Sequence, residues 1–336
     1  MVRRGNMPYN NASDTSNPKK GHRLIDIPAH DPFVVSHKET DTYYLYTTGI
    51  PELTGLERCG VLVYKSRDLL DWEGPYVVFE VPDGTWAHPQ HGTWAPEVHQ
   101  YHDKYYLFVT LHNRDTILAE PPEVWHTNHL RGTSIAVADS PEGPFELLKT
   151  DGPVPPSTFM TLDGTLYVDQ DEKPWMVYCH EWIQVIDGMF EAIPLKDDLS
   201  QASGDPQHLF KASDAPWINA ERKPDVKPAV YVSDGCQLYR TKSGHLVMLW
   251  SSYNNEGYVQ TIARSKSGRL EGPWEQLDPL VVGDSGHGML FKTFEGDWRL
   301  ILHHPFSTPE SRARIYEVEE MEDRFTIVKA RVDLHS

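Results

Sequence analysis

The sequence predicts an all-β fold, a five-bladed β-propeller with four-stranded antiparallel blades around a central channel. Short β-branched and aromatic runs bounded by Gly, Asp and Pro recur along the chain, whereas long stretches with helical periodicity are scarce. One strand–turn–strand unit is repeated five times in order. Its turns carry the Asp, Gly and Lys residues that reverse a chain into a hairpin. Radially packed blades require this repetition, and aromatic side chains fill the wedges between them.

The five copies share the same parts in the same order. Each has an acidic residue or His near Pro or Gly, then a short apolar run, a turn and an aromatic-rich second strand. The copies begin at His30 (HDPFVV), Trp94 (WAPEVHQY), Leu162 (LDGTLYV), Ser233 (SDGCQLY) and Gly286 (GHGMLF). The residues expected to open the inner strands are Asp31, Glu97, Asp163, Asp234 and His287.

A third strand is expected after most hairpins, and an outermost fourth strand after that. The third strands end in similar turns, which repeat as EGPY, EGPF and EGPW. An aromatic-rich β-sandwich with accidental internal similarity is the alternative. Five copies in order, each with the same strand–turn–strand pattern, favour the propeller.

The 336 residues fit one propeller, since all-β architectures often exceed 200 residues as a single unit. We expect residues 1–22 to form a polar N-terminal extension and residues 23–336 the propeller domain. The extension has no apolar core of the kind a signal peptide needs. The chain as given is therefore expected to be cytoplasmic, although a leader removed earlier would be compatible with this sequence.

The net charge of the chain limits the classes of binding partner that we expect. There are 49 Asp and Glu against 31 Lys and Arg, a net charge of −18. This surplus repels phosphate backbones and anionic lipids, so nucleic acid and membrane surfaces are not expected partners. No run of 18 apolar residues occurs. Three widely spaced cysteines, Cys59, Cys179 and Cys236, fit no disulfide or zinc pattern and are expected to be buried free thiols.

The propeller geometry brings the lead residues together. Inner strands line the central channel, so their first residues point into a funnel at one face of the ring. Four carboxylates that converge on one axis repel one another, and at least one of them should hold its proton more tightly than a free acid. A site of this kind obtains a general acid and a general base at one pH.

The second strand of each hairpin returns to the same rim and brings more polar and aromatic residues. Carboxylate and His hydrogen bonds beside an aromatic platform are typical of sugar binding. Inserts at residues 113–133, which include Trp125 and His126, and at 205–227 are expected to form walls of the pocket. The candidate substrate-binding residues are His30, Trp94, Glu97, His112, His180, Trp182, Tyr253 and His303.

Taken together, these motifs resemble glycoside hydrolase family 43, whose members are five-bladed propellers acting on arabinofuranosides, xylosides and galactosides. The resemblance extends from about His30 to His304. Its most specific parts are HDPFVV, HGTWAPEVHQYHDKYYLF, DGTLYVDQDEKPWMVY and GHGMLF.

The resemblance implies roles for the acids. It makes Asp31 the general base and Asp163 the residue that orients the acid and tunes its pKa. The family has a Glu as general acid at the start of the fourth blade, where this chain has Asp234. Asp is one methylene shorter, so Glu181 is an alternative proton donor, and the slightly favoured one. The chemistry needs no cofactor, but Ca²⁺ or another cation is expected in the channel near His287.

The resemblance also implies an exo-acting, inverting hydrolase of terminal furanosyl or xylosyl residues, with a glycoside or oligosaccharide as substrate. It would be an arabinofuranosidase, a xylosidase or a galactofuranosidase. A non-catalytic carbohydrate-binding propeller is the alternative, which the Asp at position 234 favours modestly. A fructoside-directed relative would have Asn-Asp-Pro-Asn in the first blade, where this chain has residues 29–32, AHDP. The sequence predicts neither the particular sugar nor the oligomeric state.

Overall fold

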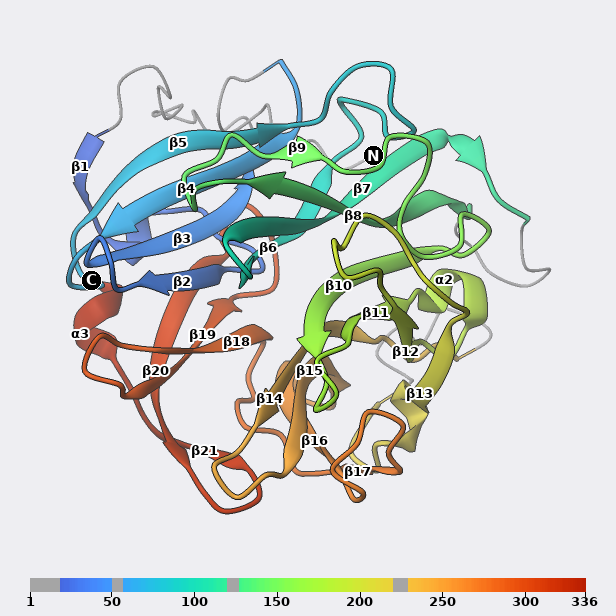
Figure 1. Cartoon of the computed structure of the whole chain (residues 1–336). Helices are drawn as coiled ribbons and strands as arrows, with labels where there is room; N and C mark the ends of the chain where they lie inside the picture. The colour runs from blue at the N-terminus through green and yellow to red at the C-terminus, as the bar shows by residue number, and fades with distance from the viewer. Residues whose placement is uncertain (1–18, 50–56, 120–126, 220–228) are drawn as a thin grey trace, which may run out of the picture.

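The computed structural model describes residues 19–49, 57–119, 127–219 and 229–336 and confirms the five-bladed propeller. Five antiparallel sheets follow one another around a ring in chain order (Figure 1). Blade one contains β1 (Lys19–His22), β2 (Phe33–His37), β3 (Thr42–Gly49), β4 (Gly60–Ser66) and β5 (Trp72–Glu80). Blade two contains β6 (Thr93–Tyr101), β7 (Lys104–Ile117), β8 (His129–Ala138) and β9 (Glu146–Leu147).

The other three blades each have four strands, and the few helices are short. Blade three contains β10 (Thr161–Val168), β11 (Pro174–His180), β12 (Met189–Pro194) and β13 (Gln207–Lys211). Blade four contains β14 (Asp234–Arg240), β15 (Leu246–Asn254), β16 (Gly257–Ser265) and β17 (Trp274–Gln276). Blade five contains β18 (Gly286–Lys292), β19 (Trp298–His304), β20 (Arg312–Glu320) and β21 (Phe325–Ala330). The helices are η1 (Leu24–Asp26), α2 (Trp182–Val185), η2 (Ala212–Asp214) and α3 (Val332–His335).

The first blade has a fifth strand that the sequence did not predict. β1 pairs with the outer strand β5, so residues 19–22, expected in the polar extension, belong to the sheet of blade one. The rest of that extension lies outside the described residues. Within the described ranges, no helix is both long and apolar enough to cross a membrane.

The inner strands share a backbone irregularity that positions the site. β6, β10, β14 and β18 each have a break in register near their first residues, as in a β-bulge. One residue at each break adopts a left-handed conformation, and Asp31 does the same just before β2. The five residues and their φ angles are Asp31 (53°), Ala95 (43°), Asp163 (54°), Gly235 (60°) and His287 (51°).

This comparison corrects two of the five expected lead positions. Ala95, not Glu97, is the left-handed residue of blade two, and Glu97 lies two residues farther along β6. Gly235, not Asp234, is the left-handed residue of blade four, and Asp234 comes one residue earlier. The feature that repeats is a backbone conformation, which Asp, His, Gly and Ala all adopt here. A search for acidic residues therefore selects the wrong position in blades two and four.

Three of the left-handed residues also bind their blade to the one before it. The backbone N–H of Asp163 donates to Thr110 Oγ1 on β7 at 2.9 Å, and that of His287 donates to Ser251 Oγ on β15 at 2.7 Å. The Gly235 N–H donates to Asp163 Oδ2 at 3.0 Å. These hydrogen bonds fix the starts of neighbouring inner strands relative to each other.

Aromatic and aliphatic side chains fill the spaces between blades. Between blades three and four, Trp250 contacts Phe190, Phe210 and Trp217, with ring centres 5.3, 5.7 and 5.4 Å apart. Trp250 and Phe190 are completely buried, which accounts for the aromatic content of the sequence. The three cysteines are buried, as expected.

Blades five and one meet without sharing a sheet among the described strands. In Figure 1, β18 lies beside β2, at the red and blue ends of the chain. Side chains and loops close this seam. Tyr43 stacks on Phe294, with ring centres 4.1 Å apart, and Ser311 exchanges two hydrogen bonds with the backbone of Ala29, at 3.1 and 2.9 Å.

Candidate active site

A cavity of about 680 Å³ lies where the inner strands begin. Residues from all five blades line it, including Trp94 of blade two and His287 of blade five. The four candidate catalytic residues also line it: Asp31, Asp163, Glu181 and Asp234. Of the candidate substrate-binding residues, the described lining includes His30, Trp94, Trp182 and Tyr253. Trp94 keeps 37% of its surface exposed.

Four other candidates are not among the described residues that line the cavity, and their contact with substrate stays a prediction. Glu97 is buried and accepts a hydrogen bond from His99 Nε2 at 2.9 Å. His180 donates to Gln184 Oε1 at 2.8 Å. His112 is fully buried beside the Trp94 ring. His303 is buried as well, but it contacts Asp31, which lines the cavity.

The two inserts are described only in part. Trp125 and His126 lie outside the described residues. His129 stands on β8 and contacts His112, and it is not part of the described lining. From the second insert, Asn219 lines the cavity, as expected for a pocket wall.

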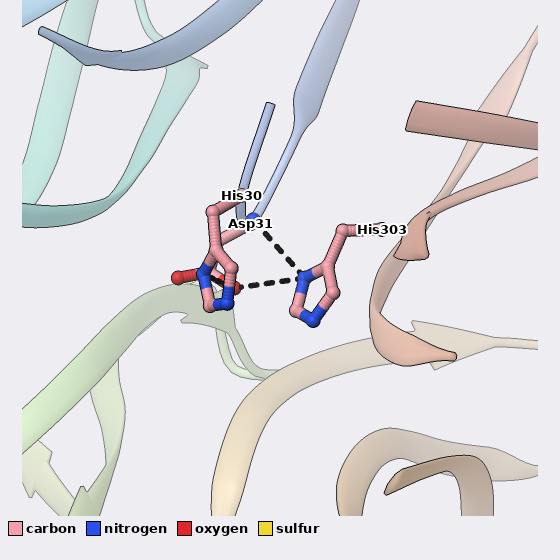
Figure 2. A group of neighbouring side chains, drawn as sticks. All are labelled: His30, Asp31 and His303. Carbon is pink, nitrogen blue, oxygen red and sulfur yellow. Dashed lines mark hydrogen bonds and ion pairs between the residues drawn. The ribbon is translucent and has the colours of Figure 1, made fainter. Parts of the chain in front are cut away.

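Three imidazoles surround the carboxylate of Asp31. Its Oδ1 lies 2.9 Å from His30 Nδ1, 3.0 Å from His287 Nδ1 and 3.1 Å from His303 Nδ1. Figure 2 shows the rings of His30 and His303 beside Asp31, with His303 also contacting its backbone N–H, which is 3.2 Å away. Histidines from blades one and five therefore hold this carboxylate in place.

This environment keeps Asp31 ionised. Burial works to raise its pKa, but His287 and His30 together hold the pKa well below its usual range. The pKa of His30 is raised: burial opposes this, and the charge and hydrogen bond of Asp31 outweigh it. The other nitrogen of His30, Nε2, lies 2.9 Å from the Phe306 carbonyl oxygen. Both nitrogens therefore face acceptors, as a protonated imidazole requires.

The neighbouring acids behave in the opposite way. Burial raises the pKa of Asp163 well above its usual range, and the charges of Asp234 and Asp31 add to the effect. Burial, followed by the charges of Glu181 and Asp31, raises the pKa of Asp234 to about 8. The Tyr258 hydroxyl donates to Asp234 Oδ2 at 3.1 Å and partly opposes that rise. Near neutral pH the pocket thus holds an ionised carboxylate beside protonated ones.

Glu181 has a different partner. It precedes α2, and its buried carboxylate accepts a hydrogen bond from Nη1 of Arg131 on β8. An adjacent guanidinium favours the ionised carboxylate. The sequence interpretation missed Arg131. The available signal was a single arginine in LRGTSIAVA, a strand with no other charged residue, because a charge in such a strand is rarely buried without a partner.

The residues around His287 do not fit the expected Ca²⁺. Calcium takes six to eight oxygen ligands. His287 Nδ1 instead faces Asp31 and, at 3.8 Å, Asp163 Oδ2. Among the described residues of this site, three have possible ligand atoms that all lie within 4.8 Å of one another. They are His30, Asp31 and His303, which offer two imidazoles and one carboxylate. That donor set suits metals that prefer nitrogen.

Comparisons with known proteins agree with this geometry. Residues 24–322 match the sequence model of glycosyl hydrolases family 43. The crystal structure of an endo-arabinase from Bacteroides thetaiotaomicron VPI-5482 is 35% identical, has a TM-score of 0.78, and the match covers 91% of this chain and 100% of that one.

Two curated relatives match over shorter regions. The extracellular endo-α-(1→5)-L-arabinanase 1 of Bacillus subtilis (strain 168) is 27% identical over 161 residues, 46% of this chain and 43% of that protein. The xylosidase/arabinosidase 43A of Humicola insolens is 29% identical over 106 residues, 32% of this chain and 27% of that protein. The matches thus span less than half the length of either relative.

Proposed function

The chain belongs to glycosyl hydrolases family 43, and from this premise we propose that it hydrolyses α-L-arabinofuranosyl linkages with inversion at the anomeric carbon. The observation that carries the proposal is that one cavity contains both Asp31, whose pKa is lowered, and Asp234, whose pKa is raised to about 8. A general base and a general acid are the two groups that inverting hydrolysis requires.

In the proposed reaction, Asp31 takes a proton from a water molecule as the water oxygen bonds to the anomeric carbon. The bond from that carbon to the leaving oxygen breaks, and Asp234 gives its proton to that oxygen. Asp163 accepts the N–H of Gly235, the residue next to Asp234, and so helps to position the acid. The raised pKa of Asp163 means that its carboxyl stays protonated and adds no second negative charge beside Asp31.

We assign proton donation to Asp234 rather than to Glu181, which the sequence interpretation slightly favoured. A proton donor must be protonated at the working pH, and the raised pKa of Asp234 meets this requirement. Glu181 is paired with Arg131, which favours its ionised form. Because Asp is shorter than Glu, the leaving oxygen would lie closer to blade four than in a glutamate-based site.

The names of the relatives support arabinan as the substrate. The Bacteroides structure is named an endo-arabinase and the Bacillus protein an endo-α-(1→5)-L-arabinanase. These names favour cleavage within a chain, whereas the sequence interpretation expected exo action on terminal furanosyl or xylosyl residues. The two modes differ in their first products, so one digestion tests both.

The experiment is a time course on linear α-1,5-arabino-oligosaccharides, with xylo-oligosaccharides and aryl galactofuranosides in parallel. Inverting action on an α-linked unit releases the β-anomer first, which NMR detects before mutarotation. Endo action gives oligosaccharides of several lengths early, whereas exo action gives arabinose together with a chain one unit shorter. A folded protein that cleaves none of these substrates, or that releases the α-anomer first, would refute the proposal.

A non-catalytic carbohydrate-binding propeller is the second candidate. The observation in its favour is Asp234, which stands where the resemblance leads us to expect a catalytic Glu. This candidate predicts that arabino-oligosaccharides bind in calorimetry while no product accumulates in the same time course.

A further inference from the structure

One buried cation in the cavity has no part in the proposed mechanism. Arg131 lines the same cavity as Asp163 and Asp234, and its side chain is only 6% exposed. Its guanidinium carbon lies 4.4 Å from the centre of the Trp94 ring, and Nη1 donates to Glu181. The guanidinium is therefore fixed in direction by an aromatic face and a carboxylate from two different blades.

Arg131 has more donors than the protein uses. A guanidinium carries five N–H groups in a rigid, planar fork. Among the described residues only Nη1 has an acceptor, and Nε is buried without one. Nη2 likewise has no acceptor among those residues, but it is not enclosed as Nε is. A ligand in the cavity cannot reach the enclosed Nε, so Nη2 is the donor to which a ligand could bring an acceptor.

The neighbours of Arg131 indicate what kind of ligand provides that acceptor. Arginine only donates hydrogen bonds, and an ionised glutamate only accepts them. Two adjacent hydroxyls on a sugar ring offer both, since each hydroxyl donates one hydrogen bond and accepts others. Trp94 adds an aromatic face of the kind on which the apolar side of a sugar packs.

We propose that Arg131, paired with Glu181 and stacked on Trp94, recognises the adjacent 2- and 3-hydroxyls of an arabinofuranosyl unit and so positions its ring against Asp234. The identity of the sugar rests on the proposed function. Recognition of adjacent hydroxyls by Arg131 rests on its own contacts. Arg131 is a specificity-determining residue and takes no part in proton transfer.

The test compares three substrates: an aryl α-L-arabinofuranoside and its 2-deoxy and 3-deoxy analogues. In the wild type, we expect kcat/KM to fall at least 10-fold when either hydroxyl is removed, since the arginine donor is then left unpaired. In Arg131→Lys the charge remains but the planar fork is lost. We expect this variant to lose activity on the parent sugar and to discriminate less than 3-fold among the three substrates.

A structural role for Arg131 would lower kcat/KM equally for all three substrates and leave discrimination intact, which would overturn the inference. Arg269→Lys is the matched control, because Arg269 is 67% exposed and pairs with Asp171 at the surface. Should Arg131→Lys fail to fold, the double variant Arg131→Met/Glu181→Gln removes both charges without leaving one buried alone. A wild type that does not discriminate among the three sugars refutes the inference without any variant.

Binding separates this inference from the proposed activity. Calorimetry with α-1,5-arabinotriose requires no turnover. Binding that weakens at least 10-fold in Arg131→Lys, in a wild type that hydrolyses nothing, would support the role of Arg131 and refute the proposed reaction. Equal binding by wild type and variant, or no binding by either, would refute the role of Arg131.

Discussion

The Nδ1 atom of His287 lies 3.0 Å from Oδ1 of Asp31, although the two residues belong to the last and the first blade. Both residues adopt the left-handed backbone conformation, with φ angles of 51° and 53°. This conformation, which few residues other than glycine adopt, directs the two side chains toward each other. The lowered pKa of Asp31 depends on this contact and on His30.

The first prediction concerns the base. Asp31→Asn should lower kcat/KM by at least about 10³-fold, because an amide cannot take a proton from water. Asn tolerates the left-handed conformation, so the fold should survive. Asp41→Asn is the matched control, since Asp41 has a φ of 52° but is 68% exposed. Near wild-type turnover in a folded Asp31→Asn protein would remove Asp31 from the reaction.

The second prediction separates the two candidate proton donors. Asp234→Asn should be nearly inactive on an arabinoside with a poor leaving group and should recover at least about 100-fold with an activated aryl leaving group, which needs no proton. Glu181→Gln should lose activity on both substrates to a similar extent, because it disturbs Arg131. Selective recovery of Glu181→Gln instead would move the acid to Glu181.

The third prediction is the pH dependence of activity. Turnover requires Asp31 ionised and Asp234 protonated. The pKa of Asp31 is well below its usual range and that of Asp234 is about 8. We therefore expect kcat/KM to be flat from mildly acidic to neutral pH and to fall about 10-fold for each pH unit above 8. A profile that already falls at pH 5–6 would contradict the assignment of Asp234.

The fourth prediction concerns stability. The folded protein holds a proton on Asp234 up to about pH 8, whereas the unfolded chain releases it near pH 4. The folded state thus binds more protons between these values, so this group's contribution to stability declines as the pH rises from 4 to 8. The amide in Asp234→Asn does not titrate, so this pH-dependent loss of stability should be absent from the variant.

Urea unfolding at pH 5 and pH 8 measures this effect. From pH 5 to pH 8, the free energy of unfolding of the wild type should fall by roughly 1–3 kcal/mol more than that of Asp234→Asn. Asp297→Asn serves as the control, because Asp297 is 64% exposed. The same pH dependence in the wild type and in Asp234→Asn would mean that Asp234 is ionised at neutral pH.

The fifth prediction concerns the inner-strand backbone. Gly235 has a φ of 60°, and a Cβ there would lie 2.9 Å from ring atoms of His287. Gly244 has a φ of 89° and open space around it. Both alanine variants strain the backbone, but only Gly235→Ala also displaces His287. It should be at least about 1 kcal/mol less stable than Gly244→Ala and should lose activity, as unfolding and kinetic measurements will show.

How far the sequence predicted the molecule depends on what each inference used. Repetition predicted the five blades, because every hairpin needs its own turn residues and aromatic wedge. Asp31, Asp163 and His287, which the sequence interpretation chose as lead residues, are the left-handed residues of blades one, three and five. In blade two the equivalent residue is Ala95, which carries no functional group, and the nearby Glu97 was chosen in its place.

The pairing of charges could not be predicted in the same way. Arg131 and Glu181 are 50 residues apart and stand on different blades. Their contact depends on how blades two and three pack, which no local pattern encodes. The same holds for the histidines around Asp31, since His303 lies 272 residues from it. Periodicity locates strands, but the charge state of each acid follows from contacts made only after the ring has formed.

The seam between blades five and one has a consequence for the order of events during folding. Every described sheet is built from strands consecutive in the chain, so each blade can assemble from local segments. The contacts across the seam include those of Asp31 with His287 and His303. Contacts between residues so distant in sequence are expected to form late. Catalytic competence should therefore arise only with the final closure of the ring, and a chain that stops before the fifth blade should have no partial activity.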